Sequence, residues 1–322
     1  MKIAFILGAG ASKPYNYPAG DELKGILLAK DNGKYVFQEK LEKLGYDADS
    51  VSAFLQALFK AEYDTLDDFI AAHQTSGDFP LMAKEAIALV ISGLEDENIL
   101  FGQGGARWYR LVVDFLRDNP EMAHRNRTVF LTFNYDRSLE HYLNDSLRHS
   151  GNAFQGVRLG DFLLGNFIHI HGNLGFLPWQ KRSDGQDMVV RAYGETPTRT
   201  TLRSIAQRML APYQTVSPGG LAPILGDADV VAIMGFGFHP QNLAKIGFTD
   251  LVKLPNVKIC ATVSALLTGR RDQLEKEPAV TTFDLDCANF TRFLFMELSA
   301  SAKAGKMELR QEWLDSYRRN RR

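Results

Sequence analysis

Cysteine is scarce in this sequence, and neither sign of charge is in excess. The two cysteines among 322 residues, Cys260 and Cys287, are too few for a four-cysteine zinc module or a disulfide framework. Lys and Arg number 37, and Asp and Glu number 38, which gives a formal net charge of −1. That balance gives no electrostatic reason to expect direct binding of nucleic acid or of an anionic membrane. We therefore look for function in a site rather than in surface charge.

Long hydrophobic runs are missing as well. No stretch approaches the ~20 apolar residues of a membrane-spanning helix, and the apolar start of the chain is too short for the core of a signal peptide. Hydrophobic residues make up 45% and charged residues 23%, which is ordinary for a soluble globular protein. We expect a cytoplasmic protein without a membrane partner, folded as one large domain or two smaller ones.

Apolar runs that alternate with helical patterns indicate an α/β fold. Continuous apolar runs are typical of parallel strands that are buried on both faces. Strands are predicted over residues 3–7, 128–133, 167–170, 230–234, 257–262 and 280–285. Helices are predicted over residues 137–147, 265–275 and 290–298, and from Pro240 onward. Strands that alternate with helices form parallel βαβ units, so we predict a Rossmann-like parallel sheet.

About ninety residues between the first two predicted strands have an almost wholly helical pattern. Asp49 and Ser50 are predicted to cap one helix, and Thr65 with Asp68 resembles the capping box of another. Further helices are predicted over residues 81–94 and 107–116. So much helix is too long for a single crossover connection. We therefore predict an inserted helical subdomain at about residues 31–120.

Two other segments interrupt or follow the predicted α/β domain, which spans residues 1–300. Residues 176–223 are polar and contain five prolines, so they are predicted to form a surface excursion with one helix near residues 200–210. Residues 301–322 are predicted to form a helical tail, with five Arg in its last thirteen residues. That basic tail is a candidate docking surface, and a frayed, solvated helix is an equally good interpretation.

The first candidate site motif is GAGAS, which directly follows the first predicted strand. Glycine allows a tight turn and lets backbone N–H groups approach a pyrophosphate at the start of the next helix. The longer GxGxxG pattern fails because Lys13 occupies its third glycine position, so the motif also fits a plain turn. The loop is longer than such a connection needs. The residues predicted to bind a dinucleotide here are Gly8, Ala9, Gly10, Ala11, Ser12 and Gly20.

The second motif is TFNYD, residues 132–136, where a strand is predicted to give way to a helix. Ligands of open α/β sheets bind outside the carboxyl ends of the strands. Asn134 can both donate and accept a hydrogen bond, which suits it to hold a water molecule or a ribose hydroxyl. The competing interpretation is that Asn134 or Asp136 only caps the following helix.

The third motif is HIHGNLG, which contains His169 and His171. Two positions apart on a strand, both side chains are predicted to face the same way. His171 stands at the end of the strand beside Gly172, and an ordinary histidine pKa near ~6.5 suits a general base at neutral pH. His169 is assigned a supporting or packing role. Zinc binding through both would need a further Cys or carboxylate nearby in the sequence, and none is there, so no metal is expected.

Two more motifs lie at predicted strand ends. GFGFHPQN, residues 235–242, is a glycine turn that leads into a helix, and FDLDCAN, residues 283–289, follows the last strand. The candidates to contact a ligand are Gly235, Phe236 and Gly237 in the first, and in the second Cys287, which is small enough to line an adenine pocket. Each motif by itself also fits an ordinary turn between strand and helix. The combination is more specific than any member, because four of the five motifs lie where a strand of one sheet ends.

In the order GAGAS, TFNYD, HG and GFGF, these motifs resemble those of the sirtuin-like NADases. That family consists of bacterial antiviral-defence effectors and is a divergent branch of the sirtuins that lacks the zinc module. The similarity extends from Gly8 to Cys287. It implies a sirtuin-like fold in which the two glycine motifs bind NAD as substrate, and it selects Asn134 and His171 as catalytic residues. Tyr135 and Gly172 are implied to contact the dinucleotide.

The resemblance also implies hydrolysis of the nicotinamide–ribose bond. Asn134 would orient the nicotinamide ribose and the attacking water, and His171 would accept a proton from the water or through a ribose hydroxyl. Asp136 would favour the developing positive charge or fix the local geometry. The products would be nicotinamide and ADP-ribose, and the protein would be the toxic effector of an anti-phage defence system.

Two departures from the sirtuin pattern matter. Without zinc cysteines, the module that helps to shape the peptide cleft of protein-deacylating sirtuins is missing, which disfavours an NAD-dependent deacylase. The predicted strand VKICATV is not followed by the Asn-x-Glu with which many sirtuins bind the adenosine ribose. A non-catalytic sensor of NAD or ADP-ribose is the main alternative function. By the habits of the family, we expect a homo-oligomer, a complex with a regulatory protein encoded nearby, or both.

Overall fold

Six parallel strands form the main sheet of the computed structural model, which describes residues 1–63, 65–102, 107–124, 126–154, 159–180, 189–209 and 221–319. The strands are β1 (Ile3–Leu7), β4 (Thr128–Thr132), β5 (Phe167–His169), β6 (Val230–Met234), β7 (Lys258–Thr262) and β8 (Val280–Phe283). Their order in the sheet is β5-β4-β1-β6-β7-β8. Numbered among themselves along the chain, they follow the order 3-2-1-4-5-6 of a Rossmann-like sheet. The predicted Rossmann-like α/β fold is confirmed.

Burial on both faces accounts for the central strands. Every residue of β1, β4 and β6 is buried, as their continuous apolar runs predict. Successive side chains point to opposite faces, so Ile3 and Phe5 belong to one core cluster while Ala4 and Ile6 belong to the other. The predicted bounds of β1 and β6 are right, and those of the other four strands differ by one or two residues.

Helices cover both faces of this sheet, which is therefore the middle of three layers. One face packs against α7 (Trp108–Asp118), α8 (Ser138–Arg148) and α15 (Cys287–Lys303), with α9 (Leu159–Gly165) beside α8. The other face packs against α11 (Ala222–Gly226), α12 (Pro240–Lys245), α13 (Phe248–Leu251) and α14 (Thr268–Glu275). The short 3₁₀ turns η3 (Pro120–Ala123) and η4 (Gly151–Phe154) follow α7 and α8. In the described ranges, no helix combines the length and hydropathy needed to cross a lipid bilayer.

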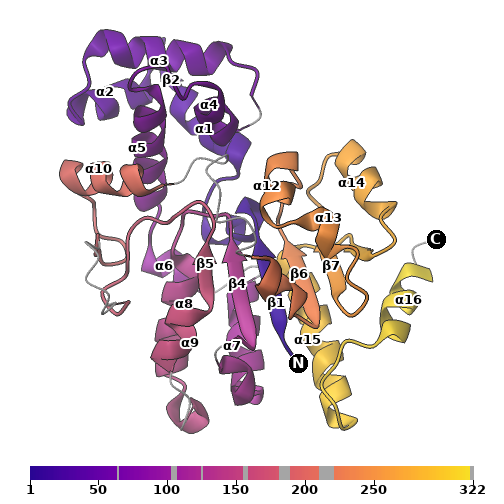
Figure 1. Ribbon diagram of the computed structural model, residues 1–322. Coiled ribbons are helices and arrows are strands. Elements are labelled where there is room, and N and C mark those ends of the chain that lie inside the picture. The colour runs from indigo at the N-terminus through magenta and orange to yellow at the C-terminus, as the bar shows by residue number, and fades with distance from the viewer. Residues whose placement is uncertain are drawn as a thin grey trace.

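The chain between β1 and α7 is mainly helical, and we call its helices α1 to α6 the helical segment. Two 3₁₀ turns come first, η1 (Ala9–Ala11) and η2 (Lys13–Tyr15). The helices are α1 (Gly20–Leu28), α2 (Val36–Lys43), α3 (Ala48–Lys60), α4 (Leu66–Ala72), α5 (Phe79–Ser92) and α6 (Glu97–Phe101). A small hairpin that was not predicted, β2 (Lys30–Asp31) with β3 (Lys34–Tyr35), joins α1 to α2. Figure 1 shows α1 to α5 above the sheet, at the end opposite to the N-terminus.

Two helix starts in this segment test the predicted caps. Thr65 caps α4 as predicted, because its hydroxyl oxygen accepts a hydrogen bond from the Asp68 amide at 3.1 Å. The predicted cap at Asp49 and Ser50 is wrong. Helix α3 begins at Ala48, and Asp47 caps it by accepting a hydrogen bond from the Ser50 amide at 2.9 Å. Asp47 stands three residues before that amide, the spacing that an N-cap side chain can reach.

The tail helix α16 (Gln311–Arg319) packs against the edge of the sheet, which does not fit a frayed, solvated helix. Tyr317 stacks on Phe283 of β8 with ring centroids 4.3 Å apart, and the ring centroids of Trp313 and Phe293 of α15 are 4.6 Å apart. Residues 320–322, the end of the predicted basic tail, lie outside the described residues.

The predicted polar excursion is described only in part. Residues 181–188 and 210–220 lie outside the described residues. Between them, α10 (Arg199–Arg208) matches the helix predicted near residues 200–210, and it packs against α5 of the helical segment. This part of the excursion is therefore packed on the helical segment above the sheet.

The turns that follow β1 and β6 touch each other through glycine. A Cβ at Gly8 would lie 2.5 Å from the Gly235 carbonyl oxygen, and one at Gly235 would lie 2.1 Å from the Ala11 amide nitrogen. Gly235 has a φ of +57°, in the left-handed region that favours glycine. The Gly10 amide donates a hydrogen bond to the Gly235 carbonyl at 3.0 Å. Glycine therefore allows the two turns to meet at the point where the strand order reverses.

We predict that Gly235→Ala lowers the free energy of unfolding strongly. An alanine at positive φ costs about 1–2 kcal/mol, and its collision with the Gly10–Ala11 backbone adds an overpacking cost of about 1–3 kcal/mol. Gly247→Ala is the matched control, because Gly247 has a similar φ of +62° with open space around its Cβ. Denaturant unfolding of both variants should show the smaller loss for Gly247→Ala. An equal loss of unfolding free energy in the two variants would contradict the close contact between Gly235 and the Gly10–Ala11 backbone.

Candidate functional site

The carboxyl ends of all six main strands border one cavity of about 870 Å³. In a parallel sheet these ends meet at one edge, and open α/β sheets bind ligands there. The bordering residues include Gly8, Ala9 and Gly10 after β1; Phe133, Asn134 and Tyr135 after β4; His171 after β5; Gly235, Phe236 and Gly237 after β6; Ser264, Ala265 and Leu266 after β7; and Asp286, Cys287 and Ala288 after β8. All five sequence motifs therefore contribute to a single cavity.

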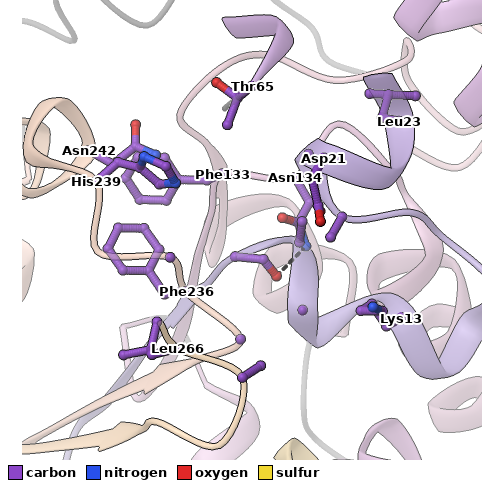
Figure 2. Close-up of a pocket in the computed structure, with 18 of the residues that line it drawn as sticks. Lys13, Asp21, Leu23, Thr65, Phe133, Asn134, Phe236, His239, Asn242 and Leu266 are labelled. Carbon is purple, nitrogen blue, oxygen red and sulfur yellow. Dashed lines mark hydrogen bonds between the residues drawn. The ribbon is translucent and has the colours of Figure 1, made fainter. Parts of the chain in front are cut away.

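The helical segment supplies the facing wall. Helix α1 contributes Gly20, Asp21 and Leu23, and the start of α4 contributes Thr65 and Asp67. Figure 2 shows Asp21, Leu23 and Thr65 across from the residues that follow β6, with Asn134 between the two groups. The cavity is thus enclosed between the sheet edge and helices that lie far from most of the site motifs in sequence.

The glycine loop after β1 places only its first three residues on the cavity. The amides of Gly8 and Gly10 are occupied, because they donate to the Met234 and Gly235 carbonyls at 3.0 Å each. Within the described chain, the amide of Ala9 has no acceptor, so it is the donor that this loop can offer to an anionic ligand. Ala11 and Ser12 are buried behind the loop and do not border the cavity.

The long loop predicted after this motif is confirmed. The chain forms the short turns η1 and η2, and α1 starts only at Gly20. The long helix whose first turn borders the cavity is α15, through Cys287 and Ala288. Its N-cap Asp286 accepts a hydrogen bond from the Asn289 amide at 2.7 Å. Helix α1, the helix that follows the first strand, also borders the cavity with its first residues, Gly20 and Asp21. The pyrophosphate expected at the start of that helix therefore stays a prediction.

Asn134 is held so that its side-chain oxygen remains available. Its Nδ2 donates to the Gly8 carbonyl at 3.0 Å, as Figure 2 shows, and to Ser12 Oγ at 2.9 Å. A carbonyl oxygen can only accept, so these contacts fix which end of the amide carries the nitrogen. In the described ranges, nothing donates to Asn134 Oδ1. The side chain can therefore accept a hydrogen bond from a ligand hydroxyl or a water molecule in the cavity.

Asp136 lies behind Asn134 and does not border the cavity. Its carboxylate accepts a hydrogen bond from Ser12 Oγ at 2.8 Å and from the Ser138 amide at 3.2 Å. Burial raises the pKa of Asp136, while the hydrogen bonds from Ser138 and Ser12 act in the opposite direction. Because Ser12 donates to Asp136 and accepts from Asn134, the geometry supports a positioning role for Asp136 and places it away from a ligand's charge.

His171 is almost fully buried, with 1% of its surface exposed, and it borders the cavity. Among the described residues, neither of its ring nitrogens has a hydrogen-bond partner. Burial, with the nearby Lys245 charge, lowers its pKa to about 3, so the ring is neutral at physiological pH. Buried polar atoms are rarely left unpaired, so the two ring nitrogens make His171 a candidate functional residue.

His169 does not share the cavity with His171, contrary to the prediction that both face the same way. The strand β5 ends at His169, and the chain turns before His171, so the two-residue alternation does not reach that far. The His169 Nδ1 donates to the Asn134 carbonyl at 3.0 Å, and its Nε2 lies 2.8 Å from Glu140. Burial lowers the His169 pKa, but the charge and hydrogen bonds of Glu140 and Asn134 outweigh it and raise the net value. His169 therefore supports the Asn134 backbone.

Most of the predicted site residues border the cavity, and the rest lie outside it. Those that border the cavity are Gly8, Ala9, Gly10, Gly20, Asn134, Tyr135, His171, Gly235, Phe236, Gly237 and Cys287. Those that do not are Ala11, Ser12, Asp136 and Gly172. At Gly172 the φ is +82° and a Cβ would lie 3.1 Å from the Arg208 carbonyl oxygen, so its glycine serves the turn and its packing.

Sequence reasoning missed two groups of polar residues that border the cavity. Asp67 on α4 accepts a hydrogen bond from the Tyr135 hydroxyl at 2.9 Å. On α14, Arg270 donates to the Gly237 carbonyl at 3.2 Å and contacts His239 Nε2 at 3.1 Å. The capping box of Thr65 and Asp68 predicted that α4 exists. Nothing in the sequence predicted that α4 lies over the edge of the sheet, where Asp67 borders the cavity.

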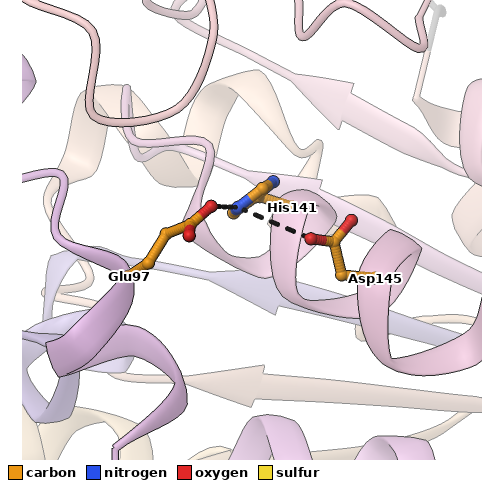
Figure 3. Close-up of side chains that lie close together, drawn as sticks. All are labelled: Glu97, His141 and Asp145. Carbon is orange, nitrogen blue, oxygen red and sulfur yellow. Dashed lines mark hydrogen bonds and ion pairs between the residues drawn. The ribbon is translucent and has the colours of Figure 1, made fainter. Parts of the chain in front are cut away.

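A separate cluster joins the helical segment to α8 away from the cavity. His141 Nε2 lies 3.0 Å from Glu97 of α6 and 3.9 Å from Asp145 of its own helix (Figure 3). Metal ions are held by His, Cys, Asp and Glu side chains. In the part of the chain that the structure describes, this is the one group of three such side chains whose ligand atoms lie close enough together to share a metal ion. The existing ion pairs account for it as a link between α6 and α8.

Comparisons with protein-family models and with curated proteins find no match to this chain.

We predict that His171 makes the fold sensitive to acid. Its folded pKa is about 3, below the ordinary value of 6.5, so below pH 6.5 the unfolded chain binds a proton that the folded chain does not. Relative to the wild type, His171→Gln should therefore gain about 3 kcal/mol of stability as the pH falls from 6.5 to 4. Denaturant unfolding of both proteins at a series of pH values measures this difference.

His169→Gln is the control with the opposite sign. The raised pKa of His169 contributes stability that is present below the unfolded pKa and is lost as the pH rises through the folded pKa. The free energy of unfolding of this variant should therefore fall furthest below that of the wild type at acid pH. A stability difference between wild type and His171→Gln that does not change with pH would show that His171 is protonated in the folded protein.

Proposed function

We propose that this chain is an NAD+ glycohydrolase that cleaves the nicotinamide–ribose bond and releases nicotinamide and ADP-ribose. The single observation that carries the proposal is the shared cavity of Asn134 and His171. Both offer hydrogen-bonding atoms without partners in the described chain, an amide oxygen and two ring nitrogens. The glycine turns after β1 and β6 border the same cavity, at the switch point where Rossmann-like sheets bind dinucleotides.

The cavity supports an extended substrate with a diphosphate at its centre. Its volume of about 870 Å³ lies within the range of cofactor sites. The Ala9 amide and the backbone of Gly235 to Gly237 would meet the diphosphate, where the strand order reverses. The nicotinamide ribose would lie toward Asn134 and His171, and the adenosine toward Ser264 and Cys287.

The chemistry needs no general acid. The bond joins ribose C1′ to a positively charged pyridinium nitrogen, and the departing nicotinamide is neutral, unlike the alkoxide of an ordinary glycoside. As the bond breaks, its electron pair passes to that nitrogen, and a water oxygen forms the new bond to C1′. Asn134 Oδ1 would orient the ribose or the water by accepting a hydrogen bond. His171 would take the proton that the water loses.

Asp136 and His169 act on this site from behind. Asp136 orients Asn134 through Ser12, and His169 holds the Asn134 backbone carbonyl. Both halves of Asn134 are therefore fixed before a ligand arrives, which is the preorganisation that catalysis requires. The resemblance of the motifs to those of antiviral-defence effectors supports a role as the toxic enzyme of such a system, with NAD as substrate. A homo-oligomer or a regulatory partner protein would restrain or activate it.

We predict that purified protein converts NAD+ to nicotinamide and ADP-ribose without an acylated peptide, and that His171→Ala and Asn134→Ala each slow the reaction about 10²- to 10⁴-fold. Separation of the products by chromatography measures the rates, with the genomic neighbours added if the chain alone is inactive. His149→Ala is the matched control, because His149 is exposed on the far end of α8 and does not border the cavity.

Three results would contradict the proposal. Wild-type rates in His171→Ala, with the fold intact, would remove the assigned base. Binding of NAD without turnover, in the presence of every neighbour, would support the sensor instead. Release of nicotinamide only when an acylated peptide is supplied would support the deacylase.

A further inference from the structure

We infer that Asp67, carried by the helical segment, is the carboxylate partner that positions the His171 imidazole. In this role the carboxylate fixes one tautomer of the ring and stabilises the imidazolium that forms when His171 accepts a proton, as carboxylates do for catalytic histidines in other folds. The inference rests on the proposed function and adds to it a residue from outside the site motifs. Asp67 acts through His171 and is therefore a positioning residue.

The geometry brings the two groups to the same part of the cavity. Asp67 Oδ2 lies 4.0 Å from His171 Nδ1, and both residues border the cavity. A hydrogen bond between these atoms needs a separation near 2.9 Å, so a shift of about 1 Å by either side chain would form it. His171 Nδ1 has no other partner among the described residues. The pair is therefore nearly made in the unliganded protein.

The carboxylate is already aimed by a second residue of the site. The Tyr135 hydroxyl donates to Asp67 Oδ1 at 2.9 Å, which leaves Oδ2 on the side of His171. Tyr135 directly follows Asn134, so the same loop that presents the amide also holds the carboxylate. The cap formed by Thr65 and Asp68 fixes the first turn of α4, where Asp67 lies. This arrangement gives Tyr135 a task that the sequence motif did not explain.

The two ring nitrogens of His171 then have separate tasks. Nδ1 would donate to Asp67, and the neutral ring would keep Nε2 as an acceptor for the proton of the attacking water. With Asp67 still 4.0 Å away, burial and the Lys245 charge hold the pKa of the ring at about 3, which makes it a poor base at neutral pH. A tuned base therefore requires a negative group at hydrogen-bond distance, and Asp67 is the carboxylate that faces His171.

Burial and nearby charges shift the pKa values of both His171 and Asp67. Burial and the Lys245 charge lower the pKa of His171, which also faces Tyr135 and Asp67. Burial raises the pKa of Asp67, and its hydrogen bond from Tyr135 and the charges of Lys245 and Lys84 lower it, while Asp68 raises it. Burial thus moves the pKa of Asp67 up and that of His171 down. A hydrogen bond between the two groups would offset both effects, because each charged form stabilises the opposite charge of its partner.

The test measures His171 directly and activity separately. NMR of protein with ¹⁵N-labelled histidine, titrated with and without ADP-ribose, reports the tautomer and pKa of His171. We expect the Nδ1-protonated tautomer in the wild type with ADP-ribose, and a lower His171 pKa in Asp67→Asn. Tyr135→Phe, which removes only the hydroxyl that aims the carboxylate, should lower the His171 pKa in the same direction. Asp49→Asn is the matched control, because Asp49 is an exposed carboxylate of the helical segment, on α3, that does not border the cavity. It should leave the His171 signals unchanged.

Kinetics with NAD+ provide the second readout. Asp67→Asn should lower kcat at least about 10²-fold with little change in KM. The acid limb of its kcat/KM profile should move to lower pH, because the carboxylate no longer raises the His171 pKa. Asp67→Glu should retain more activity than Asp67→Asn, and Asp49→Asn should keep the wild-type profile. A loss caused by misfolding would change KM, thermal unfolding and the profile of every variant on α4 alike.

The two proposals can fail separately. An identical His171 pKa and tautomer in wild type and Asp67→Asn would overturn the pairing, even in an active NADase. A pairing seen by NMR in a protein that never hydrolyses NAD+ would leave the pair in place and overturn the proposed function. Full activity of Asp67→Asn with an unchanged pH profile would also overturn the pairing.

Discussion

The site depends on the close approach of the two glycine turns at the centre of the sheet. β1 and β6 are neighbours in space although more than two hundred residues separate them in sequence, and their turns meet where a Cβ on Gly8 or Gly235 would overlap backbone. This contact sets the position of the Gly8 carbonyl, which in turn holds the Asn134 amide. Trp108 braces the same loop from α7, by donating to the Ala11 carbonyl at 2.8 Å. Packing at the switch point therefore sets the position of the Asn134 side chain, which borders the cavity.

A layer of buried polar residues stands behind the cavity and fixes the groups on its surface. Ser12 and Asp136 orient the Asn134 side chain, while His169 with Glu140 holds its carbonyl. His171 differs from all of these, because its nitrogens have no partner in the described chain. The contrast separates residues whose polar atoms are hydrogen-bonded within the described chain from His171, whose ring nitrogens are not. Asp67, which approaches His171 from the helical segment, links the two walls of the cavity.

Much of the fold could be predicted because its signals are local. Continuous apolar runs located all six main strands, and the strand–helix alternation gave their parallel arrangement. Site residues at strand ends, such as Asn134 and His171, could be predicted because the carboxyl ends of parallel strands share one edge. Two features depend on tertiary placement and could not be predicted. They are the position of Asp67 over the sheet and the turn that separates His169 from His171.

The central claim is that loops at one edge of a parallel sheet converge on a dinucleotide. A crystal structure of the protein with ADP-ribose, the proposed product, tests it most directly. The account predicts the diphosphate between the Ala9 amide and the Gly235–Gly237 turn, with ribose C1′ facing Asn134 Oδ1 and His171. ADP-ribose bound elsewhere on the molecule, or in this cavity with its ribose turned away from both side chains, would contradict the account.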